Sequence, residues 1–480
     1  MNGGERLLIS VDPCEVRSAV LRDDRLVDYA VEHRSGESLV GNVYLGRVAR
    51  IAGGIDAAFL DCGLARDGFL AGQDGPPGDG TIDRRVHEGE AMVVQVSRDP
   101  VGEKGARLTT RVTLPGRMLV LCPGGDGVTV SRRIEDAGER QRLSAALEAH
   151  IDDLDAGVIV RTAAEGCSPA DLAADLAALI DVAARIDAAR AAASAPALLR
   201  AELGPVERVL RDRLGREPDL VIVDDGEIFA LALAYAREAI PALVDRIELY
   251  RGLEPLFRAH DIEDEVAGLI EPRVALASGG ALVIEATEAL TVIDVDSAGR
   301  SARTGRAGDA ALATNLDAAA EIARQMRLRT IGGLIAIDFI GMASADEKCQ
   351  VVAALTAAVA ADPVPARVSE MSAFGVVQIT RKQERPGLVD SLTEPCPTCG
   401  GGGRLKSARA VAAEIVRDAL AEARFRPGHA VSIIASPPVA AYLRGDGGAL
   451  LHTLERAVGA RVDVVAEAGR PRASYDVAVS

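Results

Sequence analysis

The chain has 480 residues, 48% of them hydrophobic and 26% charged, which allows about three domains with cores of their own. Its formal net charge of −17 argues against a protein whose whole surface attracts nucleic acid, so any nucleic-acid site must be a local patch. No apolar run is long enough to span a bilayer and the N-terminus does not resemble a signal peptide; we therefore expect a cytoplasmic protein without a transmembrane segment.

The first predicted elements are a strand and a hairpin between Leu7 and Glu32, where polar turn residues separate alternating apolar runs. Asp12 ends the first strand. It has no partner nearby in the sequence, so we assign it a structural role.

Short strands separated by glycine turns predict a small closed barrel of the OB type between residues 42 and 99. Only 3% of the chain is aromatic, yet Tyr44, Phe59 and Phe69 fall in this one segment together with several arginines. Aromatic rings beside arginines can form a platform for single-stranded nucleic acid. The rings can equally fill the barrel core, and the residues alone leave both interpretations open.

The next segment continues as strands and contains a basic cluster, which consists of Arg107, Arg111, Arg117, Arg132 and Arg133. Ser168, Pro169 and Asp171 then predict a capped helix start, with proline at the first helical position. An apolar stripe that indicates packing follows along this helix, at Leu172, Leu176, Leu179, Ala183 and Ile186. Between residues 205 and 250, a helix, the buried strand LVIVDD and a second helix predict an α/β layer.

Two aspartates stand near the end of a predicted strand, in the run LTVIDVD from Leu290 to Asp296. Residues i and i+2 of a strand share a face about 7 Å apart, so Asp294 and Asp296 point the same way. A long helix and a second apolar strand follow, and that strand ends in Asp338. Strand, helix, strand predicts a parallel crossover, which places both strand ends at one edge of the sheet.

The three aspartates are therefore expected to converge, and such a cluster suits Mg²⁺ or Mn²⁺ and phosphoryl chemistry. The alternative is that these aspartates cap strands and turns for structural reasons. The sequence has no HExxH pair, no GxSxG elbow and no GxxxxGK[ST] loop, which argues against a zinc protease, a serine hydrolase or a P-loop NTPase.

Cys396 and Cys399 form a Cys-x-x-Cys knuckle, which is half of a tetrahedral zinc site. The chain has no second pair at a suitable spacing. Either the pair acts without metal, in a structural or redox role, or two chains each supply two thiolates and zinc links a homodimer.

At this point the sequence resembles the ribonuclease E/G family along nearly its whole length. The motifs that show the resemblance are GNVYLGRVARI, AAFLDCGLARDGFL, KGARLTT, SRRIE, VRTA, SGGALVIEATEALTVIDVDS, TNLDAAAEIARQMRLRTIGGLIAIDFI and CPTCGGGG. The resemblance is to the short form of the family, without a long tail. It implies an endoribonuclease that cuts single-stranded RNA in RNA processing and decay and leaves 5′-monophosphate products.

The resemblance also implies a multidomain fold of α/β and β type. Its expected parts are a split RNase H-like domain (1–37 and 205–270), an OB-fold RNA-binding domain (38–100), a 5′-sensor region (101–204), a DNase I-like catalytic domain (271–390), a zinc link (391–405) and a small α/β dimerisation domain (406–480). Zn²⁺ held by Cys396 and Cys399 would join a homodimer, and pairing of dimers into a homotetramer stays open.

The site residues implied by the resemblance fall into three groups. Asp294 and Asp338 would hold the catalytic Mg²⁺, with Asp296 as a third catalytic residue. The RNA-binding residues would be Phe59, Phe69, Lys104 and Tyr44. The pocket for a 5′-monophosphate would be formed by Gly116, Val120, Arg161 and Thr162.

Three positions depart from the family pattern. Asp296 stands where the family commonly has Asn, and an ionised carboxylate can only accept hydrogen bonds. Pro365 stands where relatives have an arginine that supports the 5′ pocket, with Arg367 the nearest substitute. The SRFG motif is SAFG here, from Ser372 to Gly375. These departures and the negative charge keep one alternative open, an RNA-binding or ribosome-associated scaffold with weak or no activity.

Overall fold

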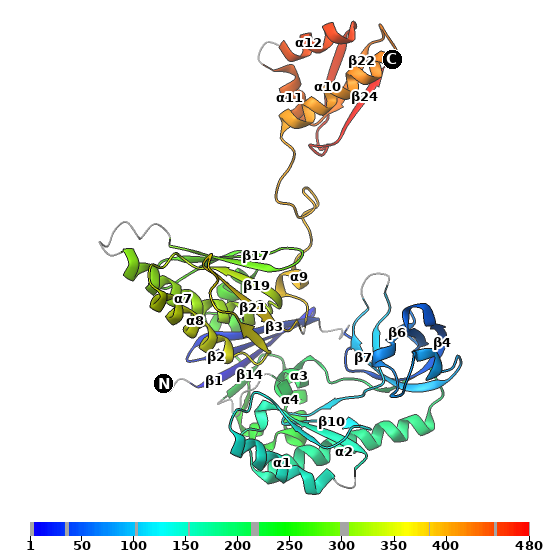
Figure 1. Cartoon of the computed structure of the whole chain (residues 1–480), viewed down its shortest axis with the longest axis vertical. Helices are drawn as coiled ribbons and strands as arrows, with labels where there is room; N and C mark the ends of the chain where they lie inside the picture. The colour runs from blue at the N-terminus through cyan, green and yellow to red at the C-terminus, as the bar shows by residue number, and fades with distance from the viewer. Residues whose placement is uncertain are drawn as a thin grey trace. The chain divides into compact units, whose positions relative to one another are not determined.

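The computed structural model describes residues 4–33, 38–100, 104–151, 154–212, 220–297, 307–383, 385–445 and 449–479. Contacts within the chain divide it into two compact units, Met1–Val389 and Asp390–Ser480 (Figure 1). The described part of the first unit contains four sheets, and that of the second contains one.

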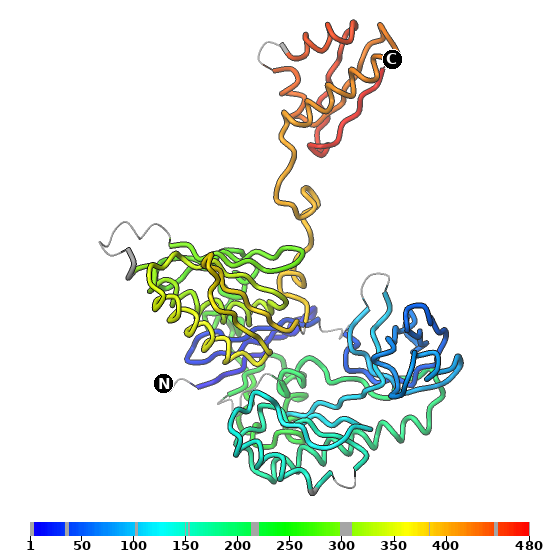
Figure 2. Tube along the Cα trace, in the orientation of Figure 1, coloured from blue at the N-terminus to red at the C-terminus, as the bar shows by residue number. Residues whose placement is uncertain are grey.

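The first sheet has the order β15-β14-β1-β2-β3. Its strands and the accompanying helices are β1 (Glu5–Val11), β2 (Glu15–Arg22), β3 (Arg25–His33), β14 (Leu220–Val223), β15 (Ile247–Leu249), α3 (Pro205–Asp212), α4 (Gly226–Ala239), α5 (Leu256–Ala259) and α6 (Glu263–Ala267). β1 pairs in parallel with β14, so segments about 200 residues apart lie side by side (Figure 2). The sheet is thus built from two stretches of chain, with two other sheets between them in the sequence.

The second sheet closes into a barrel, because β4 pairs with both β5 and β7. Its strands are β4 (Val43–Ala52), β5 (Ala57–Asp61), β6 (Gly68–Ala71), β7 (Ala91–Arg98) and β8 (Arg107–Thr109), and β13 (Ala197–Arg200) adds to β4. β8 completes the ring from beyond the expected boundary at residue 100. It can do so because Gly105 lets the backbone pass close to Asp67, where a Cβ would lie 1.9 Å from the Asp67 carbonyl oxygen.

The third sheet has the order β11-β12-β10-β9 and packs against two helices. The elements are β9 (Leu114–Pro115), β10 (Leu119–Pro123), β11 (Val128–Val130), β12 (Ala156–Val160), α1 (Ala137–Ile151) and α2 (Pro169–Ala192). The capped start predicted for α2 is confirmed, since the Ser168 and Asp171 side chains form a reciprocal capping box. The predicted stripe is buried at Leu172, Leu176, Leu179 and Ile186.

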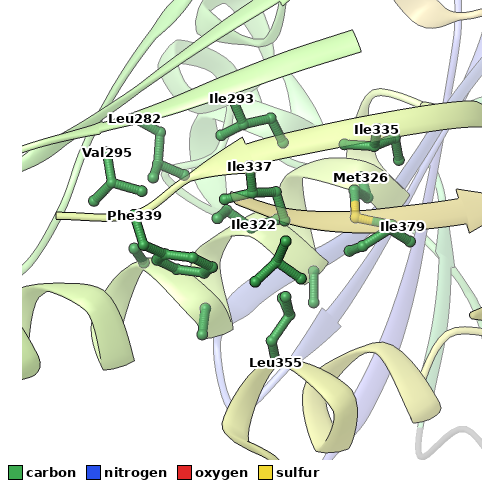
Figure 3. Close-up of a cluster of buried hydrophobic side chains, with 14 of the residues drawn as sticks. Leu282, Ile293, Val295, Ile322, Met326, Ile335, Ile337, Phe339, Leu355 and Ile379 are labelled. Carbon is green, nitrogen blue, oxygen red and sulfur yellow. The ribbon is translucent and has the colours of Figure 1, made fainter. Parts of the chain in front are cut away.

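The fourth sheet has the order β16-β17-β18-β19-β21-β20 and is covered on one face by α7 and α8, so we call it the α7/α8 sheet (Figure 1). Its elements are β16 (Arg273–Ala275), β17 (Ala281–Ala286), β18 (Thr291–Asp296), β19 (Gly333–Asp338), β20 (Ala366–Val368), β21 (Val376–Arg381), α7 (Ala307–Leu328) and α8 (Ala345–Ala360). β18 and β19 are parallel, as the predicted crossover requires. Ile293 and Ile337 point from these strands into the core, toward Ile322 of α7 and Leu355 of α8 (Figure 3).

The second unit contains the sheet β23-β22-β24 with three helices. Its elements are α10 (Ala408–Phe425), β22 (Val431–Ala435), α11 (Pro437–Arg444), α12 (Ala449–Val458), β23 (Val462–Ala466) and β24 (Tyr475–Val479), and α9 (Leu388–Leu392) spans the boundary between the units. None of the helices described is both long and apolar enough to cross a membrane. The cytoplasmic location and the domain names taken from the resemblance stay predictions.

Candidate active site and nucleic-acid interface

Two carboxylates lie side by side where β18 and β19 end. Asp294 and Asp338 are register partners on these parallel strands, so their Cα atoms are about 5 Å apart. Ile293 and Ile337, the residues just before the two aspartates, are buried against the helices. Because side chains alternate between the two faces of a strand, Asp294 and Asp338 point to the opposite face, where both are exposed. We call Asp294 and Asp338 the carboxylate pair.

Asp296 is held differently, although it lies on the same face. Nη2 of Arg273, on β16, is 3.1 Å from its Oδ2, and both side chains are about half exposed. Across the part of the chain that the structure describes, no group of three or more His, Cys, Asp or Glu residues is placed to hold a metal ion. The described residues therefore do not form a three-carboxylate metal cluster, because Arg273 of β16, two strands away in the sheet, engages Asp296. The catalytic role of Asp296 stays a prediction.

Helix α7 fixes the loops around the carboxylate pair. Asn315 is fully buried; its Nδ2 donates to the Ile340 carbonyl at 2.8 Å, and its Oδ1 accepts from the Ile340 amide at 3.1 Å. Oδ2 of Asp317 accepts a hydrogen bond from the Ser278 amide at 2.7 Å, which ties down the turn between β16 and β17. No role was predicted for these two residues, although Asn315, a weak helix former inside a long predicted helix, was a usable signal.

The carboxylate pair fits a divalent hard cation. Mg²⁺ is typically bound through one or two carboxylates and keeps several waters, so it needs oxygen ligands on an open surface. The pair supplies two such ligands from rigid strands, and two adjacent like charges are stabilised by a cation between them.

Two phenylalanines flanked by two arginines form a row across neighbouring strands of the barrel. In register, Arg50 of β4 lies beside Phe59 of β5, Phe59 beside Phe69 of β6, and Phe69 beside Arg107 of β8. The two rings meet edge to face at 5.7 Å between centroids, and the Arg50 guanidinium lies 4.2 Å from the centre of the Phe59 ring. Both rings are half-buried, so each keeps part of its surface open to a ligand. We call these four residues the aromatic row.

Tyr44 does not belong to this surface. It is 5% exposed, packs in the barrel core, and its hydroxyl oxygen accepts a hydrogen bond from Nδ2 of Asn42 at 3.3 Å. β4 is buried on both faces here, because the preceding Val43 packs into the core of the four-stranded sheet. The prediction that Tyr44 binds RNA is corrected to a core role. Lys104 is exposed, as an RNA contact requires.

The four residues expected to bind a 5′-phosphate lie in one corner of the four-stranded sheet. Arg161 follows β12, and its Nη1 donates to the Gly116 carbonyl at 2.6 Å. The Thr162 hydroxyl is 3.2 Å from the Ser131 hydroxyl, and Val120 lies opposite Ile159 on β12. The structure thus brings them together, but Nη2 of Arg161 is already bonded to Asp212 at 2.9 Å.

Two carboxylates missed by sequence analysis shape this corner. Asp175 of α2 accepts hydrogen bonds from the backbone amides of residues 117–119, and a Cβ on Gly116 would lie 2.8 Å from its carboxylate oxygens. Burial raises the pKa of Asp175 above its ordinary value despite these hydrogen bonds. Burial acts on Asp212 in the same direction, but the adjacent Arg211 and Arg161 outweigh it and lower the pKa of Asp212.

Arg133, from the basic cluster, binds protein and joins this corner to the α7/α8 sheet. Its guanidinium donates to the carbonyls of Ala360, Asp362 and Pro363, where α8 ends. Cations near a helix C-terminus are stabilised by its unpaired carbonyls. The Asp362 carboxylate in turn forms a buried ion pair with Arg381 of β21 at 2.8 Å.

The Cys-x-x-Cys knuckle is exposed at Cys396 and half-buried at Cys399, and all seven cysteines are free thiols. The Gly400 amide donates to the Cys396 carbonyl at 2.7 Å, which closes the turn. Backbone amides of Cys399 and Thr398 point at the Cys396 thiol and lower its pKa, so the thiolate needed for zinc is favoured. Within the described residues the knuckle has no third ligand, so a tetrahedral zinc fits only if a second copy supplies the other two.

An exposed carboxylate pair at one end of a sheet and an arginine-flanked aromatic surface on a small barrel are features that suit a metal-dependent enzyme acting on nucleic acid. The model of the ribonuclease E/G family matches residues 113–384, more than half of the chain, and that of the RNase E/G thioredoxin-like domain matches residues 395–479.

Individual relatives match over nearly the whole chain. Ribonuclease G of Escherichia coli (strain K12) is 37% identical over 484 residues, covering 98% of this chain and 99% of the relative. Ribonuclease G of Haemophilus influenzae is 34% identical over 98% of this chain and 99% of the relative. Ribonuclease E of E. coli K12 is 34% identical over 96% of this chain, which spans 45% of that longer protein. The chain belongs to the ribonuclease E/G family and is an endoribonuclease of RNA processing.

Proposed function

We propose that this enzyme cuts single-stranded RNA by Mg²⁺-dependent hydrolysis and leaves a 5′-monophosphate on the downstream product. The observation that supports this most is the register of Asp294 against Asp338 on an exposed face at the end of a parallel strand pair. The helices cover the opposite face, so a polymer can cross the carboxylate pair without displacing any core residue.

A bound Mg²⁺ supplies Lewis-acid activation of water and neutralises charge on the phosphate oxygens. Asp294 and Asp338 would hold the ion, and their place on paired strands fixes the distance between them. In the reaction, water attacks phosphorus and the 3′ oxygen of the upstream nucleotide leaves. The phosphate therefore stays on the 5′ oxygen of the downstream fragment as a monophosphate, and the upstream fragment ends in a 3′ hydroxyl.

The aromatic row supports the preference for single strands. Phe59 and Phe69 can stack on bases only when those bases are unpaired and splayed out. Arg50 and Arg107 flank the rings, although Arg107 also pairs with Asp74 at 2.7 Å. The row therefore provides both stacking surface and positive charge on a chain whose net charge is −17.

The proposal is tested by comparing one RNA sequence as a single strand and as a perfect duplex, with Mg²⁺ and with excess EDTA. Cleavage of the single strand alone, and only with Mg²⁺, is the expected result. Cleavage that persists in EDTA, or equal rates on strand and duplex, would contradict it. RNA binding without any cleavage would favour a scaffold instead.

Replacing Asp296 by Asn is expected to leave Mg²⁺ affinity within about threefold of the wild type, because Asp296 is engaged by Arg273 and a half-exposed ion pair is worth about 0–1 kcal/mol. The affinity is measured from the Mg²⁺ dependence of the cleavage rate. Asp296→Ala is compared with Asp296→Asn, and a higher cleavage rate in the Asn variant shows that a polar side chain at this position is sufficient. If Asp296→Asn requires tenfold more Mg²⁺, Asp296 is a metal ligand and this account of it fails.

The 5′ pocket is expected to make a 5′-monophosphate RNA a better substrate than its 5′-hydroxyl counterpart. A hydrogen bond to a charged group contributes about 1.5–3 kcal/mol, so Arg161→Gln is expected to reduce that advantage about tenfold or more. Thr162→Val is expected to reduce it less, because it removes a neutral donor. The ratio of kcat/KM for the two substrates measures the effect. Equal wild-type rates on both substrates would show that Arg161, bound to Asp212, does not sense the 5′ end.

We also propose that two copies join through zinc at the knuckle. The lowered pKa of Cys396 predicts faster alkylation by iodoacetamide than at Cys14, an exposed cysteine outside the knuckle, at neutral pH and without zinc. One zinc ion per two chains is expected to suppress this difference, read by mass spectrometry of the labelled peptides. A protein that binds one zinc ion per chain, or stays monomeric with zinc, would contradict the shared site.

A further inference from the structure

Phe374 is a large apolar side chain that the fold leaves in water. It lies in the turn between β20 and β21 and is 92% exposed. Its neighbour Met371 packs against the core of the α7/α8 sheet, so the turn is anchored while the ring is not. A ring with this exposure adds almost no burial energy to folding, and it is free to contact a ligand.

The turn that presents the ring is well defined. The Ser372 amide donates to the Val376 carbonyl at 2.9 Å, and the Gly375 amide donates to the Ser372 carbonyl at 3.0 Å. The Ser372 hydroxyl accepts from the Val376 amide at 3.2 Å. Gly375 has a φ of +87°, which other residues rarely adopt. Phe374 is the third residue of this four-residue turn and is held at its tip.

The turn lies at the same sheet edge as the carboxylate pair. Val376, the first residue of β21, is the register partner of Asp338, which is itself the partner of Asp294. β21 runs antiparallel to β19, so the residues just before β21 lie beyond the carboxyl end of β19. Phe374 is two residues from Val376 along the chain, so their Cα atoms are at most about 7 Å apart, which puts Phe374 within a nucleotide's reach of the pair.

We infer that Phe374 stacks on the base of a nucleotide that adjoins the scissile phosphate. The inference rests on the proposed function and adds a substrate-binding residue to it. Stacking uses the face that every base has, so it holds RNA without selecting a sequence. It fixes the nucleotide beside the carboxylate pair and so favours a reactive alignment of the phosphate.

The first test measures binding without cleavage. A single-stranded RNA with 2-aminopurine beside the cleaved bond is titrated with enzyme in EDTA, and stacking is read as fluorescence quenching. Wild type and Phe374→Trp are expected to quench, and Phe374→Ala is not. Leu253→Ala, which removes another fully exposed apolar side chain, is the control and is expected to quench. The inference would be overturned if Phe374→Ala quenched as strongly as the wild type both with the probe upstream and with the probe downstream of the cleaved bond.

The second test measures cleavage with Mg²⁺. Phe374→Ala is expected to lower kcat/KM about 5- to 150-fold on intact RNA, and Phe374→Trp to restore most of it. Wild type is expected to lose a similar factor on RNA with an abasic nucleotide at the stacked position, and Phe374→Ala to lose nothing more there. If the losses from Phe374→Ala and from the abasic nucleotide multiply, or if Phe374→Ala cleaves intact RNA as fast as the wild type, the inference about Phe374 is overturned and the proposed function is not. A wild type that binds but never cuts RNA overturns the proposed function as well.

Discussion

Replacing Asp294 or Asp338 by Asn is expected to lower RNA cleavage by about 100-fold or more. Each substitution removes one of the two charges of the carboxylate pair, and stabilisation of transition-state charge by a metal is worth several kcal/mol, at a factor of ten for each 1.36 kcal/mol. Asn is nearly isosteric and the positions are exposed, so the fold is expected to persist. Single-turnover cleavage of a single-stranded RNA at saturating enzyme measures the effect.

Glu285→Gln is the matched control for these variants. Glu285 is exposed on β17, two residues along the strand from Val283, the register partner of Asp294, so the substitution removes a carboxylate from the same sheet without touching the pair. It is expected to cleave within about threefold of the wild type, because a surface substitution away from a site has little effect. If either Asn variant cleaves as fast as Glu285→Gln, the carboxylate pair is not the catalytic centre.

Replacing Phe59 or Phe69 by Ala is expected to weaken binding of single-stranded RNA about 5- to 150-fold. Base stacking on an aromatic side chain is worth about 1–3 kcal/mol by alanine substitution. The two rings contact each other, so the double variant is expected to lose less than the product of the single losses. Fluorescence anisotropy in EDTA gives the affinities without cleavage.

Salt dependence separates stacking from charge in the aromatic row. Phe59→Ala is expected to leave the slope of log K against log salt unchanged, whereas Arg50→Gln is expected to reduce it by about 0.7 if Arg50 contacts one phosphate. Ile55→Ala removes a 65% exposed apolar side chain of the same barrel and is expected to change neither quantity. Unchanged affinity in both phenylalanine variants would place the RNA surface elsewhere.

The carboxylate pair was predictable because it depends on local rules. Alternation along β18 puts Asp294 on the face away from the core, and the strand, helix, strand order makes β18 and β19 parallel neighbours. The ion pair of Asp296 was not predictable. It requires Arg273 of β16, and no local pattern gives the order of β16 and β17 beside β18.

The barrel shows a second limit of periodicity. Tyr44, Phe59 and Phe69 all lie on strands. The alternation of apolar and polar residues along a strand does not show which face of a closed barrel is covered by another part of the chain. Packing beside Val43 buries the start of β4 on both faces, so Tyr44 enters the core while Phe59 and Phe69 stay half-buried. Asp212, which engages Arg161 from about 50 residues away, likewise depends on a tertiary contact.

The most direct test of the central claim is the chemistry of the cut ends. A single-stranded RNA is digested with wild-type enzyme and Mg²⁺, and the masses of both fragments are measured. We predict a downstream fragment with a 5′-monophosphate and an upstream fragment with a 3′ hydroxyl, both absent with Asp294→Asn. A 2′,3′-cyclic phosphate with a 5′ hydroxyl, or the same fragments from Asp294→Asn, would contradict hydrolysis at the carboxylate pair.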